Sequence, residues 1–494
     1  MAAEKRQVVV IGSGPTGAMA ATVLIRRGIP VTLLESGQSL PRGWLVRVGG
    51  RTFYRRLPQF GAPQQYTSTA ESNAIWKDRL IPGGMSNFWS GTVPRFAPED
   101  FYEGERLHEQ YRWPLTYEDL LPYYEQIEKI LEISGSPQAV PNLPASQVTY
   151  RRTLPAQWQA VARHADKVGR GFTVVPSATG SPWLILRRGT FFNSFNKLVQ
   201  NLLRSPHFSL FLGAHALRLE WDGARKKVTG VIYIDRTTGV ERRLAAEAVV
   251  VAAGPLASTR LLLHSTSPDF PDGLGNTEGL LGRYLHDHVE QWANLELSRA
   301  VTRLDPAAYM TRVEYRRSEP LMAASCTLGF GSSKPIDRLL ARTPIKGKTF
   351  GLVLFASMIP SPSNYVRLDS TLKDRFGQSQ LNFHVCRSDD SFRALASTQE
   401  DLLRILEAAG YHATIRGLIT KQPGASVHYG GTVRMHASPR YGILNGCNRM
   451  HAVTNVAVVD ASSFTTGPEK NPVPTAMALS ARAADRLAED LRRS

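Results

Sequence analysis

The sequence predicts an α/β nucleotide-binding domain with a second, largely antiparallel domain inserted into it. The chain opens with a strand–helix–strand pattern at residues 7–34, and a buried strand followed by a helix recurs at 249–264. It closes with a strand at 455–462 and a long apolar helix. Between these segments, residues 290–390 alternate apolar and polar side chains, which is typical of antiparallel strands with one face in the core.

Composition fits a folded protein of two or three domains. The chain has 494 residues, of which 42% are hydrophobic and 20% charged, and this excludes wholesale disorder. Its 3 cysteines are far apart, so they form neither a disulfide framework nor a CxxC zinc site, and they favour a reducing compartment. We find no signal-peptide core and no apolar run of about 18 residues. We therefore expect a cytoplasmic protein without a membrane span.

The charge balance is strongly basic, with a formal net charge of +17. Such a balance is compatible with nucleic acid, an anionic membrane or an acidic substrate. The arginines are scattered, however, and no nucleic-acid-binding signature accompanies them. We interpret the charge as a solvated surface and expect no nucleic-acid partner.

A dinucleotide-binding motif follows the first strand. Gly12, Gly14 and Gly17 give the spacing G-x-G-x-x-G between a strand at 7–11 and a helix. The first glycine permits a tight turn, the second lets the backbone approach a pyrophosphate, and the third lets helix and strand pack closely. Glu35 ends the second strand, where a carboxylate accepts hydrogen bonds from a ribose diol. The motif does not separate FAD from NAD, although its N-terminal position and the chain length favour FAD.

The remaining elements are predicted from hydrophobic periodicity and from glycine and proline positions. Residues 135–185 are rich in loops. We expect helices at 99–134, 190–203, 255–264, 394–410 and 474–491, and strands at 208–212, 215–221, 228–235, 240–245 and 249–254.

A series of motifs then resembles one enzyme family over nearly the whole chain. In order they are VVVIGSGPTGAMAA with Glu35, GGMSNFWSGTVPRF, WPLTYEDLLPYYEQIEKIL, VVVAAGPLASTRLLLHS, LGRYLHDH, SVHYGGTVRM and NVAVVDASSFTTGPEKNPVPTAMALSARAAD. The set resembles the glucose-methanol-choline (GMC) family of FAD oxidoreductases. Within it, the sequence is most similar to bacterial pyranose-oxidase-like enzymes, including C-glycoside 3-oxidases.

The resemblance implies a fold and a division into two domains. It implies an FAD-binding Rossmann-like domain of the GMC type, formed by residues 1–100, 186–290 and 425–494. It also implies an α+β substrate-binding domain with a large antiparallel sheet, formed by residues 101–185 and 291–424. The activity implied is oxidation of an alcohol to a carbonyl by hydride transfer to flavin N5.

The dinucleotide motif and the resemblance together assign the cofactor-binding residues. In the family, the segment GGMSNFWS wraps the flavin ring and the ribityl chain, and Leu217 contacts the adenine through its backbone. The assigned residues are Gly12, Gly14, Pro15, Thr16, Gly17, Glu35, Ser36, Gly84, Met85, Ser86, Asn87, Phe88, Trp89, Ser90, Leu217, Ala253, Asp460, Ala461, Pro472 and Thr475.

One position departs from the related fungal pyranose oxidases, which carry a histidine bonded covalently to the flavin. The corresponding residue here is Phe88, and a phenyl ring cannot form that bond. We therefore predict noncovalent FAD.

The resemblance places a catalytic pair at His428 and Asn471. Alcohol oxidation needs a base for the hydroxyl proton, and histidine has its proton affinity near neutral pH. A carboxamide can orient the substrate oxygen. We expect His428 to be the base and Asn471 its orienting partner. The structural alternatives are a histidine bonded to a backbone carbonyl and an asparagine that shapes the turn before Pro472.

Two further histidines, His286 and His288, flank Asp287. The spacing H-x-H could suggest a metal, but no further ligand cluster is visible in the sequence. We expect no metal site, and the resemblance implies that this run packs at the domain junction near the cofactor.

Several functions remain open at this stage. The first is oxidation of a secondary ring hydroxyl of a sugar or glycoside to a ketone, with oxygen or another acceptor. The second is a GMC dehydrogenase for a primary alcohol, polyol or aminosugar. A third is a flavin-binding subunit that passes electrons to a partner protein, and a non-enzymatic FAD scaffold is a fourth. An oligomer is possible.

Overall fold

The computed structural model describes residues 7–38, 65–178, 192–302, 304, 307–313, 322–329 and 346–493. The first two residues of the helix predicted at 190–203 lie outside the described residues.

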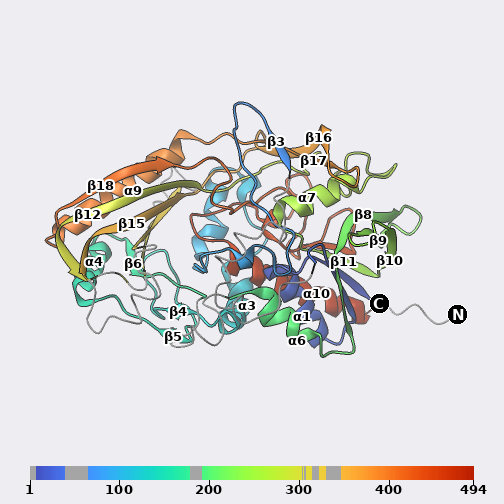
Figure 1. The fold of residues 1–494 in the computed structure, drawn as a ribbon, viewed down its shortest axis with the longest axis horizontal. Coiled ribbons are helices and arrows are strands. Elements are labelled where there is room, and N and C mark those ends of the chain that lie inside the picture. Colours follow the sequence, from blue (N-terminus) through green and yellow to red (C-terminus); the bar gives the residue numbers. More distant parts are fainter. Residues whose placement is uncertain are drawn as a thin grey trace.

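A five-stranded parallel sheet forms the nucleotide-binding half of the molecule (Figure 1). Its order is β19-β11-β1-β2-β7. The strands β1, β2 and β11 are buried along their whole length, which explains why they read as runs of apolar residues without alternation. The strand bounds are Val8–Ile11 for β1, Val31–Glu35 for β2, Phe208–Leu212 for β7, Ala248–Val251 for β11 and Val456–Val458 for β19.

Helices from both ends of the chain pack on this sheet. Helix α1 (Pro15–Arg26) follows β1 and lies against α10 (Val473–Arg493), and α10 also contacts α3 (Tyr117–Leu131) (Figure 1). Helix α7 (Pro255–His264) follows β11. The sheet thus joins segments that are more than 400 residues apart in the sequence, as the strand–helix patterns at the two ends of the chain predicted.

A three-stranded antiparallel sheet extends the nucleotide-binding half. It consists of β8 (Ala214–Asp222), β9 (Lys227–Asp235) and β10 (Glu241–Ala245), in the order β10-β9-β8. Its three strands match the predicted ranges to within one or two residues.

A six-stranded antiparallel sheet forms the other half, in the order β18-β12-β15-β14-β13-β6. One face packs on α9 (Asp389–Ala408) and α4 (Ala156–Lys167), with Leu295, Leu352 and Leu402 in a common core. The opposite face carries polar and aromatic side chains. The strand bounds are Gly171–Val174 for β6, Val289–Thr302 for β12, Ala308–Val313 for β13, Ala323–Leu328 for β14, Lys346–Ala356 for β15 and Ala413–Thr420 for β18.

Short elements complete the fold. Two small sheets are β16-β17-β3 and β4-β5. The bounds are Tyr66–Ser68 for β3, Ser134–Gly135 for β4, Tyr150–Arg151 for β5, Tyr365–Lys373 for β16 and Ser379–His384 for β17. Single turns of helix lie at η1 (Gly84–Asn87), η2 (Pro98–Phe101), η3 (Glu103–Arg106), η4 (Glu109–Tyr111) and η7 (Ala461–Ser463), and a π-helical turn, η6 (Phe195–Val199), leads into α6 (Gln200–Leu202).

Two predicted regions differ from the structure. Within residues 99–134, the α-helix runs only from Tyr117 to Leu131. Pro114 disfavours a helix that continues through it, and the side-chain oxygen of Thr116 caps the start of the observed helix. Residues 135–185, expected to be loops, contain α4 and β6. The buried residues of α4, namely Trp158, Val161 and Ala165, have helical spacing that the prediction overlooked.

The predicted fold class is confirmed: an α/β cofactor-binding half stands beside a large antiparallel sheet. The domain boundaries stay a prediction. Helix α3 was expected in the substrate-binding domain, and its buried residues belong to the hydrophobic cluster of the parallel sheet.

Candidate active site

A cavity of about 720 Å³ runs from the parallel sheet to the antiparallel sheet. At one end it meets the residues that follow β1, β2 and β11, at the carboxyl edge of the parallel sheet, where open α/β sheets bind ligands. At the other end it meets side chains of β12 and β15. The cavity therefore connects the predicted nucleotide site with the predicted substrate sheet.

The glycines of the dinucleotide motif shape the first end. A Cβ on Gly12 would lie 2.4 Å from the carbonyl oxygen of Ala252, and Gly12 has φ +102. A Cβ on Gly17 would lie 1.9 Å from the carbonyl oxygen of Gly12, so this glycine is needed for packing. Gly14 has no atom within 4 Å of its virtual Cβ and lines the cavity. The open side of Gly14 is a cradle that fits a pyrophosphate.

The predicted ribose acceptor, Glu35, is buried at the edge of the cavity. Its carboxylate accepts hydrogen bonds from the backbone N–H and hydroxyl of Ser13 and from the N–H of Gly37. Burial raises its pKa. A carboxylate has about four acceptor sites, so these three bonds orient the group and leave capacity for a ribose hydroxyl.

Three helices begin at the cavity wall. Pro15 at the start of α1, Pro255 at the start of α7, and Val473 at the start of α10 all line the cavity. The first N–H groups of a helix lack partners within the helix, and the helix dipole places positive potential there. This arrangement favours a ligand that carries phosphates or a polarised ring.

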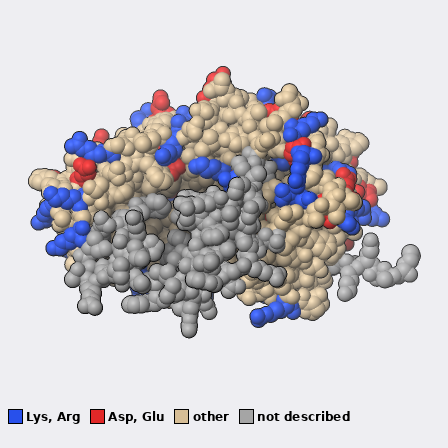
Figure 2. All heavy atoms as spheres, viewed as in Figure 1, with Lys and Arg blue, Asp and Glu red and all other residues tan. Residues whose placement is uncertain are grey.

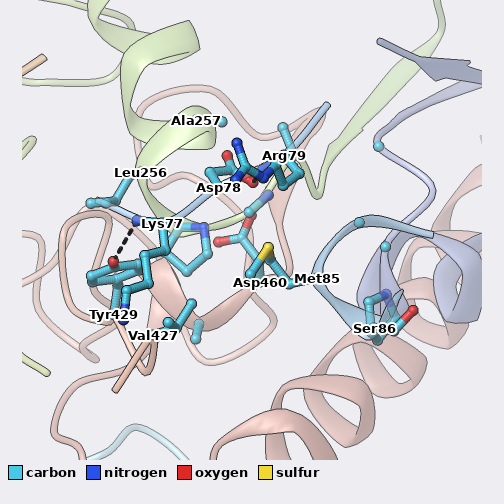
Figure 3. A pocket seen from close by; sticks show the side chains of 18 of the residues that line it. Lys77, Asp78, Arg79, Met85, Ser86, Leu256, Ala257, Val427, Tyr429 and Asp460 are labelled. Atoms are coloured by element: carbon cyan, nitrogen blue, oxygen red, sulfur yellow. Dashed lines mark hydrogen bonds between the residues drawn. The ribbon is translucent and has the colours of Figure 1, made fainter. Parts of the chain in front are cut away.

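The segment after the predicted glycine turn contributes a further wall. Gly83 and Gly84 have φ +87 and +53, and they begin η1, which presents Met85 and Ser86 to the cavity. Figure 3 shows Met85 and Asp460 beside the same space, although they come from segments that are far apart in the sequence. Phe88 also lines the cavity.

Most predicted cofactor-binding residues line this cavity. They are Gly12, Gly14, Pro15, Thr16, Glu35, Ser36, Gly84, Met85, Ser86, Phe88, Trp89, Ser90, Ala253, Asp460, Ala461 and Pro472.

Four predicted residues do not line the cavity, and each has a structural contact instead. Gly17 packs on Gly12, as described above. Asn87 donates to the carbonyls of Pro82 and Gly84. The Leu217 carbonyl accepts a hydrogen bond from the Gln378 side chain, 3.0 Å away. The Thr475 hydroxyl lies 2.7 Å from the hydroxyl of Tyr124.

Sequence reasoning missed the segment from Trp76 to Ile81, which forms one side of the cavity. Figure 3 shows Asp78 and Arg79 extending into it, and Lys77 donating its backbone N–H to the Tyr429 hydroxyl at 3.0 Å. Burial raises the pKa of Asp78 to about 7. The signal for this segment was weak, because it is a polar loop with no periodicity.

His428 lies in the cavity wall beside the substrate sheet. Its Nε2 atom is 3.0 Å from Nδ2 of Asn471, and both residues line the cavity. Its Nδ1 atom is 2.9 Å from Nδ1 of His288. Burial, with a smaller effect from His288, holds the pKa of His428 well below its usual value. At neutral pH the imidazole is therefore uncharged and can accept a proton.

The backbone before His428 is strained. Val427 has φ 62, a left-handed conformation that costs a β-branched residue about 1–3 kcal/mol. Asp287 holds this turn, because its Oδ1 atom accepts the His428 N–H at 2.8 Å and the hydroxyl of Ser426. The predicted H-x-H run thus supports the site through its central carboxylate.

Asn471 belongs to a loop with a buried ion pair. The Lys470 ammonium is 2.9 Å from carboxylate oxygens of both Asp100 and Glu469, and all three side chains are fully buried. Burial raises the pKa of Glu469 to about 7, and the Asp100 carboxylate also raises it, against the lowering effect of the Lys470 ammonium. The loop is therefore fixed by charges that water cannot reach.

The antiparallel sheet supplies the wall opposite the nucleotide end. Glu290 pairs with Phe355 across β12 and β15, and Trp292 pairs with Val353. These four side chains line the cavity. The Trp292 indole N–H donates to Glu290 Oε1 at 2.5 Å, and its side chain is 42% exposed. An aromatic ring beside a carboxylate can hold a molecule rich in hydroxyl groups.

Comparison with known families decides the identity of this site. Residues 67–290 and 360–480 match the GMC oxidoreductase family, and residues 5–73 match an FAD binding domain. The chain belongs to the GMC oxidoreductase family. It is an FAD-dependent oxidoreductase that acts on CH–OH groups, and the glycine cradle, Glu35 and the helix N-termini of the cavity fit that cofactor.

Named relatives cover almost the whole chain. A 2-methyl-1,2-propanediol dehydrogenase from Mycolicibacterium austroafricanum is 28% identical over 98% of this chain and 95% of the relative. A paromamine 6'-oxidase from Streptomyces fradiae is 27% identical over 98% of this chain and 91% of the relative. A 6'''-hydroxyparomomycin C oxidase from Streptomyces lividus is 28% identical over 98% and 91%.

A solved structure shares the fold. The pyridoxine 4-oxidase from Mesorbium loti superposes with a TM-score of 0.67 at 17% identity, covering 99% of each chain. At this identity the likeness concerns the fold alone. The special closeness to pyranose-oxidase-like enzymes that the motifs suggested is not confirmed by these relatives.

Neither a membrane-spanning helix nor a cluster of metal ligands occurs in the described part of the chain. None of the helices described is both long and apolar enough to cross a membrane. Within the same ranges, His, Cys, Asp and Glu side chains form no group of three that could hold a metal ion.

Figure 2 shows Lys and Arg side chains at several separate places on one face, with Asp and Glu among them.

The first prediction concerns the flavin linkage. Phe88 lines the cavity and has no ring nitrogen that could bond covalently to a flavin, so we expect acid precipitation of the yellow enzyme to release free FAD. The absorbance of the supernatant measures the released flavin. A fluorescent flavin band that stays with the denatured chain in a gel would contradict the prediction.

The second prediction concerns Glu469. Its pKa in the folded protein, about 7, lies above the ordinary value of 4.5, so the folded state binds its proton more tightly. The stability from this proton is present below pH 4.5 and is lost as the pH rises through about 7. Glu469→Gln mimics the protonated group. We expect its melting temperature, relative to the unmodified enzyme, to improve between pH 5 and pH 8. Glu489→Gln, at a partly exposed residue that pairs with Arg486 on the surface, is the control, and a difference that is constant with pH would contradict this account.

Proposed function

We propose that the enzyme oxidises a hydroxyl group of a sugar or glycoside to a ketone, with His428 as the base. The observation that carries the proposal is the pair formed by His428 and Asn471, 3.0 Å apart, in the wall of the cavity between the nucleotide end and the substrate sheet. When bound, FAD supplies the acceptor for the hydride.

His428 and Asn471 can divide the work at the substrate hydroxyl. A substrate hydroxyl that binds beside this pair, in place of the direct contact between the two side chains, gives its proton to Nε2 of the imidazole, which is neutral at neutral pH. The Asn471 carboxamide can donate a hydrogen bond to the same oxygen and fix its orientation. The hydrogen on the carbinol carbon leaves as a hydride with the electron pair of the C–H bond. The electron pair of the broken O–H bond then forms the second C–O bond of the carbonyl.

The substrate sheet supports a sugar-like molecule. Trp292 offers an aromatic surface, and Glu290, which is buried to 7% exposure, accepts hydrogen bonds. Carbohydrates combine apolar ring faces with a rim of hydroxyl groups, and these two side chains suit both features. The names of the paromamine and hydroxyparomomycin oxidases agree with a sugar-like substrate for this chain too.

A second candidate is a dehydrogenase for a primary alcohol, polyol or aminosugar that uses an acceptor other than oxygen or an electron-transfer partner. The name of the diol dehydrogenase relative favours it. A panel of monosaccharides, glycosides, aminosugars and diols, assayed with oxygen and with a dye acceptor, separates the candidates. A ketone product supports the first proposal, and an aldehyde product supports the second.

The third prediction concerns the base. His428→Ala removes the proton acceptor, so we expect the rate of FAD reduction by the best substrate of the panel to fall by ~10²-fold or more. The FAD content should stay unchanged. His436→Ala is the matched control, because His436 contacts the Glu109 carbonyl and does not line the cavity. Near-normal reduction by His428→Ala would overturn the proposal.

The fourth prediction concerns the substrate wall. Trp292→Ala removes the aromatic surface, and we expect KM to rise about 10-fold, or roughly 1.4 kcal/mol, with little change in kcat. Trp292→Phe keeps an aromatic ring and should retain most of the affinity. Equal KM values for the two variants would remove Trp292 from the substrate site.

A further inference from the structure

We propose that His288 is a positioning residue that holds His428 in the tautomer whose Nε2 atom has no hydrogen and carries the lone pair that accepts a proton. The inference deepens the proposed function and rests on the role of His428 in it. It follows from the hydrogen-bond roles of four ring nitrogens, starting from a backbone carbonyl.

The Pro468 carbonyl fixes the first ring. It lies 2.6 Å from Nε2 of His288. A carbonyl oxygen can only accept, so Nε2 of His288 carries the hydrogen and donates it. Burial, together with a smaller effect of the nearby Lys470 ammonium, lowers the pKa of His288 to about 4 against the raising effect of the Pro468 carbonyl, so the ring is neutral at neutral pH. Its Nδ1 atom then has a lone pair and no hydrogen.

The second ring takes its tautomer from the first. The Nδ1 atoms of His288 and His428 are 2.9 Å apart, and one of them must donate. Because Nδ1 of His288 has no hydrogen, Nδ1 of His428 donates. In a neutral imidazole the other nitrogen is then an acceptor. The Nε2 atom of His428 therefore carries a lone pair, and it faces the Asn471 amide nitrogen at 3.0 Å.

The opposite assignment conflicts with the contacts. If Nδ1 of His428 accepted, its Nε2 would carry a hydrogen and would face the N–H of the Asn471 amide, donor against donor. His288 would also have to carry two hydrogens and a charge beside Lys470, in a site from which water is excluded. The assignment with Nδ1–H on His428 satisfies all three contacts.

Packing keeps the two rings in this geometry. Their centroids are 4.7 Å apart at an interplanar angle of 66°, and the Phe355 ring lies 5.4 Å from His288 and 5.3 Å from His428. Asp287 holds the backbone N–H of His428 at 2.8 Å. Neither ring can turn over without losing a hydrogen bond, so the tautomer is set before a substrate arrives.

The experiment measures the tautomer directly in the FAD-loaded enzyme. Enzyme labelled with ¹⁵N at histidine gives ring-nitrogen shifts that separate Nδ1–H from Nε2–H forms, and His428→Ala assigns the His428 signals by their loss. We expect the Nδ1–H form of His428 at neutral pH. The Nε2–H form as the major tautomer in the unmodified enzyme would overturn the inference.

Two variants test the dependence on His288. His288→Leu removes the acceptor, so we expect the His428 tautomer to shift towards Nε2–H and FAD reduction to slow by ~10²-fold. His288→Asn places its Oδ1 atom near the former Nδ1 position and should keep the Nδ1–H form and stay within ~10-fold of the unmodified rate. Unchanged tautomer signals in a folded, FAD-loaded His288→Leu enzyme would overturn the inference.

A double variant separates this inference from the proposed function. In a His428→Ala background, His288→Leu should add no further loss, because the two residues act through one proton acceptor. If His428→Ala alone leaves the rate intact, the proposed function fails. If His428→Ala is slow and His288→Leu slows it further by the same factor, only the positioning role fails.

Discussion

The loop from Thr466 to Asn471 is the constraint on which the active site depends. Thr466 accepts from the Trp113 indole, Gly467 pairs with Met358, and the Pro468 carbonyl meets His288. The next carbonyl accepts from Ser325, and Lys470 is held between two buried carboxylates. A buried ammonium without such partners would be strongly unfavourable. These contacts fix the position of the loop, and therefore also the position of Asn471.

This arrangement couples the two halves of the molecule at the reacting centre. The partners of the loop come from β14, from the segment before β12 and from the turns near residue 100. Asn471 stands at the start of α10, which packs on α1 of the nucleotide half. The base and its amide partner are consequently placed relative to the FAD end of the cavity by contacts with both sheets, which a catalytic geometry requires.

The nucleotide-binding half and most of its cavity lining could be predicted from the sequence, because backbone conformation and burial restrict which residues can occupy these positions. Gly12, Gly14 and Gly17 are specified by backbone approach, and uninterrupted apolar runs mark β1 and β11. Asp460 and most of the predicted cofactor residues line the cavity as a result. The pairing of His428 with Asn471 was predicted from the order of the family motifs along the chain, because no local sequence pattern indicates it.

Other features could not be predicted because they exist only in three dimensions. His288 is one residue among several histidines until the Pro468 carbonyl and His428 are brought to its two nitrogens. The left-handed Val427 contradicts its own local preference, and the Asp287 carboxylate that stabilises the turn is 140 residues away. The contact of Leu217 with the adenine stays a prediction: its neighbours Ala216 and His215 line the cavity, and the Leu217 carbonyl accepts a hydrogen bond from Gln378.

The parallel sheet described at the outset has β19 at its edge, and α10 closes the cavity beside it. Residues after β19 therefore supply part of the wall of the same cavity that Gly14 lines, although the two segments are far apart in the sequence. The cofactor site is therefore a property of the assembled tertiary structure, and the glycine-rich segment alone does not form it.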